Sequence, residues 1–115
     1  MSEGKVRVII KRPEEEFGHV TNISTSLKNL QNTVGGHVES VAIAVFGDGN
    51  EIVILCDEEG RLKGKEFNCE VCGIDFVGDI ICAQLAPNEE GEMDFVDLEI
   101  SFGVWKEIVL GRSDL

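Results

Sequence analysis

The sequence predicts an α+β domain, with a mainly antiparallel sheet of about five strands and two helices packed on one face. Three observations support this prediction. Short apolar or alternating runs recur along the chain between turn residues. One segment has helical periodicity between a clear start and a clear stop, and a second helical pattern comes near the C-terminus. The predicted element order is ββαβββα, and 115 residues are the size of one domain, residues 1–115.

The first two predicted strands precede the first helix. Residues 5–11 begin with alternating apolar and charged side chains, and Pro13 ends this strand. A shorter second strand is predicted over residues 17–23, with Val20 and Ile23 as its apolar positions.

The first helix has the clearest signals in the chain. Residues 24–26 are Ser, Thr and Ser, whose hydroxyl oxygens can cap the free amides of a first helical turn. Leu27, Leu30 and Val34 then fall on one helical face, and the two glycines at 35–36 end the helix. Because so short a helix is marginal alone in water, we expect it to pack on the sheet.

The middle of the chain predicts three more strands. Residues 38–45 are rich in Val, Ile and Ala and predict a largely buried strand. Residues 47–50 predict a hairpin turn, and residues 52–56 form the returning strand. An irregular polar stretch is expected over 63–68, and another strand over 77–85.

The C-terminal part fits two descriptions. Residues 88–94 form a polar, acidic loop. Apolar residues in 98–110 alternate as in a strand, but they also recur at helical spacing, and the helix is favoured. Asp97 can cap it, and Gly111 can close it. A sheet of this kind leaves an edge strand free, so a homodimer through such an edge is compatible with the prediction.

The charge excludes some classes of partner. Ten Lys and Arg residues stand against 22 Asp and Glu residues, which gives a formal net charge of -12. We therefore expect no direct binding to nucleic-acid phosphates and no polybasic contact with a membrane. The first residues lack the pattern of a signal peptide, and no apolar run approaches the roughly 20 residues of a membrane span. The sequence therefore predicts a cytoplasmic protein with reduced thiols.

The pair Cys69-x-x-Cys72, followed by glycine, has the spacing of a zinc knuckle. A closed structural site needs two more ligands, for which the candidates are Cys56, Cys82, His37 and His19. However, a second Cys-x-x-Cys pair is missing, and Cys56 and Cys82 stand beside apolar strand residues. Plain buried thiols are therefore the favoured interpretation, and zinc is the only cofactor that the sequence suggests.

The sequence contains no recognisable catalytic motif. The chain lacks a nucleophile elbow and a phosphate-binding loop. Residues 57–59 are three successive acids that could bind a hard cation, but a solvated turn is the favoured interpretation. Asp79 is expected to be a turn residue. The sequence therefore predicts a protein that is not an enzyme.

Half of the net charge lies in the last quarter of the chain. Residues 87–115 contain eight acids against Lys106 and Arg112, a balance of -6. This segment is either a solvated surface or a face complementary to a basic protein partner. In the second case, the partner-binding candidates are Glu89, Glu90, Glu92, Asp94, Asp97 and Glu99.

Several stretches together resemble a known family. They are Leu27-Lys28-Asn29-Leu30-Gln31, Val34-Gly35-Gly36-His37-Val38-Glu39, Asp57-Glu58-Glu59-Gly60-Arg61-Leu62-Lys63-Gly64, Asn68 and Gly78-Asp79-Ile80-Ile81. Their order and spacing resemble the family of domain of unknown function 3846, over about residues 5–85. Its members are small proteins of phages, plasmids and conjugative elements, so the resemblance implies that context and an α+β fold. It supplies no catalytic mechanism, and because the Cys69–Cys72 pair is not a mark of the family, it gives no support for a metal. The acidic C-terminal segment is expected to lie outside the matched region.

Three hypotheses for function follow. The first is a non-enzymatic accessory protein of a mobile element, which binds a basic protein partner through its acidic surface. Counter-defence is one form of it, with the nucleic-acid groove of a host defence enzyme as the target. The second is a small metalloprotein with structural zinc. The third is a binder of a cationic or neutral small ligand in a cleft between the sheet and the helices.

Overall fold

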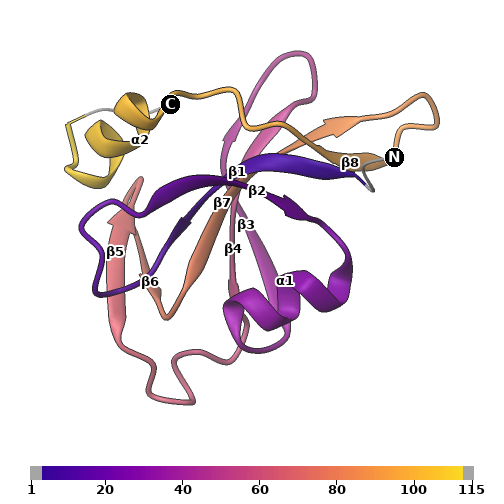
Figure 1. Ribbon diagram of the computed structural model, residues 1–115. Helices are drawn as coiled ribbons and strands as arrows, with labels where there is room; N and C mark the ends of the chain where they lie inside the picture. Colours follow the sequence, from indigo (N-terminus) through magenta and orange to yellow (C-terminus); the bar gives the residue numbers. More distant parts are fainter. Residues whose placement is uncertain (1–3, 113–115) are drawn as a thin grey trace.

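The computed structural model describes residues 4–112, in which eight strands and two helices form (Figure 1). The predicted α+β class is confirmed, with more strands than the five expected. In chain order the elements are β1 (Lys5–Lys11), β2 (His19–Ser24), α1 (Leu27–Val34), β3 (Val38–Val45), β4 (Glu51–Asp57), β5 (Phe67–Val71), β6 (Ile74–Val77), β7 (Ile80–Pro87), β8 (Met93–Val96) and α2 (Phe102–Val109). Neither helix of this part of the chain is long and apolar enough to cross a membrane.

Six strands form one antiparallel sheet in the order β2-β1-β7-β4-β3, and β8 also pairs with β7. Strand β7 is central, because β4 lies along one of its sides and both β1 and β8 lie along the other. Ile9 of β1 stands opposite Cys82, and Val96 of β8 stands opposite Gln84. Strands β1 and β8 are therefore in line with each other along one side of β7.

Both faces of this sheet are covered. One apolar cluster joins Trp105 and Ile108 of α2 to one side of β1, β4 and β7. A second cluster joins Leu30 and Val34 of α1 to the other side of the same strands. Figure 1 shows the two helices on different sides of the sheet. The prediction that both helices pack on one face is therefore wrong. The physical reason is visible in β4, where residues at successive positions are buried, as in a sheet covered on both sides.

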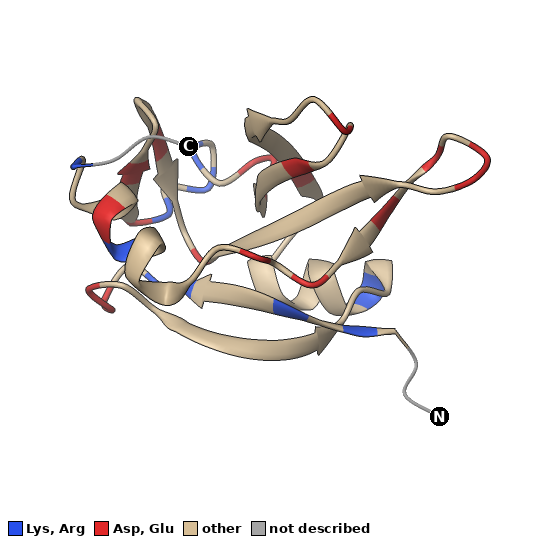
Figure 2. Cartoon of the chain, turned by 90° about the horizontal axis from the view of Figure 1, so that it is seen from above, with Lys and Arg blue, Asp and Glu red and all other residues tan. Residues whose placement is uncertain are grey.

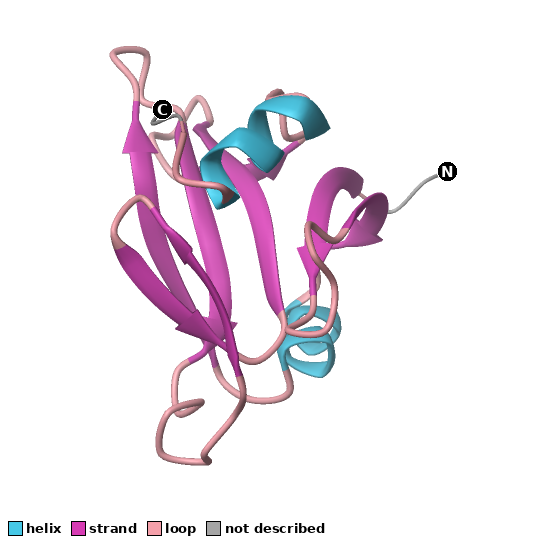
Figure 3. Cartoon of the chain, turned by 90° about the vertical axis from the view of Figure 1, so that its left-hand side faces the viewer, coloured by secondary structure: helices cyan, strands magenta, loops and turns pink. Residues whose placement is uncertain are grey.

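A small second sheet, the β5–β6 hairpin, covers part of the α2 face (Figure 3). Val71 and Phe76 of this hairpin are buried in the same cluster as Trp105. The predicted irregular stretch is confirmed for residues 63–66, but Phe67 and Asn68 already belong to β5, and the strand predicted to begin at Val77 begins at Ile80. Strands β5 and β6 are short and mixed in composition, so they carry little of the alternation that identifies a strand.

Helix α1 begins and ends as predicted. The Ser26 hydroxyl accepts a hydrogen bond from the backbone amide of Asn29 at 3.2 Å, which is the N-cap geometry. Gly35 has φ +80°, the left-handed conformation that favours glycine, and its amide donates to the Gln31 carbonyl at 2.8 Å.

Helix α2 confirms the favoured description of the C-terminal part, but its cap differs from the prediction. Ser101, not Asp97, is the N-cap, and its hydroxyl accepts from the amide of Val104 at 3.1 Å. The chain before the helix is extended, because the Leu98 amide donates to the Arg7 carbonyl at 2.9 Å. Leu98 is buried in the α2-side cluster, so its packing requires this extended path.

Strand β3 is an edge strand, although the sequence predicts it to be largely buried. It pairs only with β4 among the described strands, and it leaves Glu39, Ser40, Ala42 and Val45 exposed. The strand register shifts between Ala42 and Ala44, which marks a β-bulge. Val, Ile and Ala predict a strand, but this composition does not reveal whether a second neighbour is present.

Candidate functional site

The four cysteines lie on different elements that meet at the α2 side of the sheet. Cys56 is on β4, Cys69 on β5 and Cys82 on β7, and all three are buried in the apolar cluster of that face. Cys72 lies at the turn of the β5–β6 hairpin, is partly exposed and packs against the same cluster. The fold thus brings the four sulfur-bearing residues to one region but gives them unequal access to water.

Burial keeps three of these thiols protonated. It raises the pKa of Cys56 and of Cys69 to about 11, and it raises the pKa of Cys82 well above its usual range. The thiolate is the reactive form of cysteine, so these three side chains are poor nucleophiles at neutral pH. Their surroundings are those of core residues.

The zinc hypothesis gains no geometric support. Within residues 4–112, no three side chains of His, Cys, Asp or Glu converge so that they could hold a metal ion. The His19 ring lies 3.3 Å from the Glu15 carboxylate, on the outer strand β2. His37 precedes β3, where its carbonyl accepts from the Glu58 amide at 2.7 Å. Zinc stays a prediction of the cysteine spacing, and a metal analysis of untagged protein tests it.

We expect a thiol reagent at about pH 8 to label one cysteine fast in the folded protein and all four after unfolding. The fast thiol should be Cys72, because the other three are buried with raised pKa values. A Cys72→Ser variant should lose the fast phase, and the matched Cys69→Ser variant should keep it. Two fast thiols in the native protein would contradict this arrangement.

The acidic candidates near the C-terminus divide into two groups. We call Glu89, Glu90, Glu92 and Asp94 the acidic hairpin, since they lie at the projecting end of β7 and β8 (Figure 2). All four are exposed. Asn88 shapes the turn, because its side-chain oxygen accepts from the amides of Glu90 and Glu92, each at 2.9 Å. The Asn88 side-chain nitrogen also donates to the Asp94 carboxylate at 3.1 Å, so the acidic hairpin is a defined turn with four exposed acidic residues.

Asp97 and Glu99 belong to the extended segment that leads to α2. The Asp97 carboxylate accepts from the Arg7 amide at 2.8 Å, which ties this segment to β1. The Glu99 amide donates to the side-chain oxygen of Gln84 at 3.0 Å, and Gln84 is buried. Of the two, Asp97 has a direct internal role that its place in an acidic run does not indicate.

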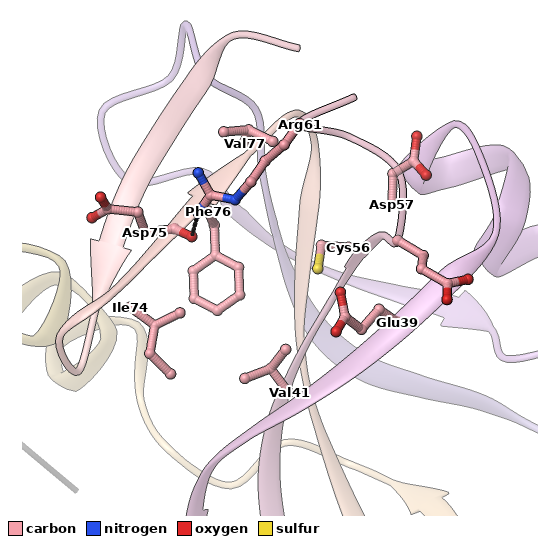
Figure 4. A pocket seen from close by; sticks show the side chains of 10 residues that line it. Glu39, Val41, Cys56, Asp57, Arg61, Ile74, Asp75, Phe76 and Val77 are labelled. Atoms are coloured by element: carbon pink, nitrogen blue, oxygen red, sulfur yellow. Dashed lines mark hydrogen bonds between the residues drawn. The ribbon is translucent and has the colours of Figure 1, made fainter. Parts of the chain in front are cut away.

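A cleft of about 260 Å³ lies between β3 and β6 (Figure 4). Val41 of β3 and Phe76 of β6 face each other across it, and Cys56 lies between them at the base. The guanidinium of Arg61 donates to the Asp75 carbonyl at 2.8 Å. We call this the β3–β6 cleft, and its lining residues are Glu39, Val41, Cys56, Asp57, Glu58, Arg61, Ile74, Asp75, Phe76 and Val77.

Asp57 is buried, although the sequence predicts a solvated turn or a cation site at residues 57–59. Its carboxylate lies 2.7 Å from the Lys63 ammonium and 2.9 Å from that of Lys65, and it accepts from the Glu59 amide at 2.9 Å. Burial alone would raise the pKa of Asp57. The hydrogen bonds from both lysines and from this amide outweigh burial and hold the pKa well below its usual range.

The same two lysines also cap helix α1. The Lys65 ammonium donates to the Val34 carbonyl at 2.8 Å, and the Lys63 ammonium donates to the Gly35 carbonyl at 3.2 Å. Positive charge is favourable at this end of a helix. Gly36 is needed here, because a Cβ at this position would lie 2.5 Å from the Asp57 carboxylate. These contacts bind the end of α1 to the end of β4.

A second buried polar centre joins Lys11 to Asn68. The Lys11 ammonium donates to the Asn68 side-chain oxygen at 2.7 Å. The Asn68 side-chain nitrogen donates to the carbonyls of Lys11 and Gly78, at 2.8 and 2.7 Å. Alternation along residues 5–11 puts Lys11 on the same face as the buried Ile9, and this is the one signal in the sequence that indicates its burial.

These two polar centres use several of the residues that carry the family resemblance: Gly36, Asp57, Lys63, Asn68 and Gly78. Their contacts join a helix end, strand ends and the loop before β5. The resembling stretches therefore build the framework of the domain.

The comparisons with known proteins agree with the resemblance and extend it. A family model described as Domain of unknown function (DUF3846) matches residues 6–101. The match continues past Leu85 to residue 101, so the expectation that the acidic segment lies outside the family region is wrong for residues 87–101, which include all six partner-binding candidates. The structural reason is that β8 pairs with β7 within the main sheet. No curated protein and no solved structure matches the chain. The family model covers most of the sequence, and the chain therefore belongs to the DUF3846 family of domains of unknown function.

Proposed function

We propose that this protein is a non-enzymatic binding protein that recognises a basic surface of a protein partner through an acidic face, of which the acidic hairpin is the main part. The distribution of the cations is the observation that carries the proposal. Within residues 4–112, eight of the ten Lys and Arg side chains contact a carboxylate, a carbonyl, an amide oxygen or an aromatic ring of this same chain. They are Arg7, Lys11, Arg12, Arg61, Lys63, Lys65, Lys106 and Arg112.

The acidic hairpin is the clearest part of this face. The chain has no Lys or Arg between Lys65 and Lys106, so no cation neighbours the hairpin in sequence. Among the described residues, its four carboxylates form no ion pair, and Figure 2 shows no Lys or Arg on β7 and β8. Such a surface speeds the approach of a basic partner and makes binding depend on salt.

The family context suggests the kind of partner. Because the resemblance implies a phage, a plasmid or a conjugative element, a host protein or a protein of the element itself is the proposed target. Counter-defence is one form of this function, in which the acidic face occupies the nucleic-acid groove of a host defence enzyme. The protein would then compete with nucleic acid without binding it.

We expect a basic host protein to be retained by the immobilised protein at about 50 mM salt and released at about 500 mM. A variant with Glu89→Gln, Glu90→Gln, Glu92→Gln and Asp94→Asn should lose that retention, because it removes the four charges and keeps the side-chain shapes. The bound proteins are compared by mass spectrometry.

The matched control removes four charges elsewhere, by changing Glu14, Glu16, Glu59 and Glu66 to Gln. These side chains are exposed as well, so both variants have the same net charge. The control should keep the partner. If both variants lose the partner equally, net charge alone explains the binding. If both retain it equally, the acidic hairpin does not bind the partner.

A further inference from the structure

The β3–β6 cleft is bounded by two strands that each have a free side. Among the described strands, β3 ends the main sheet and pairs only with β4, while β6 pairs only with β5. A free strand edge presents unpaired backbone N–H and C=O groups, which an extended peptide can bind as an additional strand. The free edge of β3 therefore lies beside a pocket that can accept side chains of a bound peptide.

The register shows which backbone groups of β3 face outward. The His37 carbonyl accepts from the Glu58 amide, so the backbone groups of His37 face β4. The direction of these groups alternates along a strand, so those of Glu39, opposite Cys56, also face β4. Residues between these positions point their N–H and C=O groups away from β4. Ser40, opposite Leu55, is such a residue, and it is exposed.

The side chains beside this edge define a pattern for the incoming strand. Glu39 and Val41 line the cleft, whereas Ser40 between them does not. Opposite Glu39, the added strand should carry a Lys or Arg, because opposite charges attract across paired strands. Opposite Val41, it should carry an apolar residue, because Phe76 and Ile74 lie across the cleft from Val41. The two positions are two residues apart on the added strand, because side chains alternate between faces.

We propose that the β3–β6 cleft binds an extended peptide segment of a partner protein as an added strand on β3. The segment carries Lys or Arg opposite Glu39 and an apolar residue two positions away, opposite Val41. This surface is separate from the acidic hairpin, so the inference goes beyond the function proposed above and does not depend on it.

A second copy of the chain fits the edge less well. The described strands with a free side are β2, β3, β5, β6 and β8, and none of them contains Lys or Arg, so edge pairing between two copies would supply no cation opposite Glu39. Strand β1 does contain Lys and Arg, but it is paired on both sides inside the sheet. The cleft is lined by Glu39, Glu58 and Asp75 against Arg61, apart from Asp57, which is paired with two lysines, so its charge favours a basic segment from another protein.

The test uses a labelled, end-blocked heptapeptide, Thr-Val-Thr-Lys-Thr-Val-Thr, and the same peptide with Glu in place of Lys. Fluorescence polarisation of the peptide with the full chain measures the Kd. The Lys peptide should bind, and the Glu peptide should bind about tenfold more weakly, because like charges would then face each other. The acidic-hairpin variant should bind the Lys peptide as the wild type does, which separates this proposal from the previous one.

Three further variants locate the binding. Ser40→Pro removes an outward N–H that the β3–β4 pairing does not use, so it should abolish binding, while Ser40→Ala should keep it. Glu39→Lys should reverse the preference in favour of the Glu peptide. If circular dichroism shows that Ser40→Pro does not fold, this charge reversal decides the question alone.

The proposal is overturned if the Lys peptide does not bind, if both peptides bind equally, or if folded Ser40→Pro binds as well as Ser40→Ala. It is also overturned if the wild type is a dimer that Ser40→Pro converts to a monomer, since the edge is then occupied by a second copy.

Discussion

Replacing Trp105 by Ala is expected to lower the free energy of unfolding by about 3–5 kcal/mol. Trp105 is fully buried on α2, in the cluster that joins this helix to the sheet and the β5–β6 hairpin. Its indole N–H also donates to the Phe17 carbonyl at 2.8 Å, so the change leaves a large cavity and an unpaired carbonyl. We expect the C-terminal helix to be the first element to loosen.

Urea unfolding followed by far-ultraviolet circular dichroism measures this loss, since the variant has no Trp left for fluorescence. Trp105→Phe is the matched control, because it keeps an aromatic ring and removes the donor. It should cost less than half as much as the Ala change. A loss below about 1 kcal/mol for Trp105→Ala would mean that α2 does not pack on the sheet as described.

Replacing Asp57 by Asn is expected to cost about 2 kcal/mol at neutral pH, because the buried carboxylate loses two charge-assisted hydrogen bonds, while the partly exposed Lys63 and Lys65 can turn to water. The folded pKa of Asp57 lies below its unfolded value, so the unfolded chain takes up the proton first as the pH falls. The stability due to Asp57 is therefore complete above about pH 5 and is lost as the pH falls toward the folded pKa. The difference between wild type and variant should shrink over the same range.

Asp79→Asn is the matched control for Asp57. Asp79 lies 3.8 Å from the Arg12 guanidinium, and both side chains are exposed to water. Its removal should change stability by less than about 0.5 kcal/mol, with little dependence on pH. Urea unfolding at several pH values compares the three proteins. Equal losses for the two variants would contradict the buried ion pair at Asp57.

Features with a local cause could be predicted from the sequence. Helix α1 begins at a serine cap and ends at Gly35, and the strand at Lys5–Lys11 has its own alternation. Features that depend on distant residues could not. Whether α2 packs on the same face as α1 depends on which sides of β4 and β7 remain to be covered, and no local pattern records this.

The candidate site shows the same division. The acidic hairpin is visible in the sequence, because four acids stand together in a turn. The burial of Asp57 is not, because it depends on Lys63 and Lys65 returning across the end of α1. The edge position of β3 is likewise a property of the whole sheet, since composition alone cannot show that no second strand pairs with it.

Because β7 and β8 are paired directly below it, the turn at the tip of the acidic hairpin can be exchanged for another turn. Pro87 and Met93 already stand opposite each other, and the Asn88 amide donates to the Glu92 carbonyl at 2.7 Å just beyond them. A turn of another length or charge can therefore replace residues 88–92 without a change of register in the sheet. Deleting the chain after Pro87 would instead remove β8 and leave about half of one side of β7 without a paired strand.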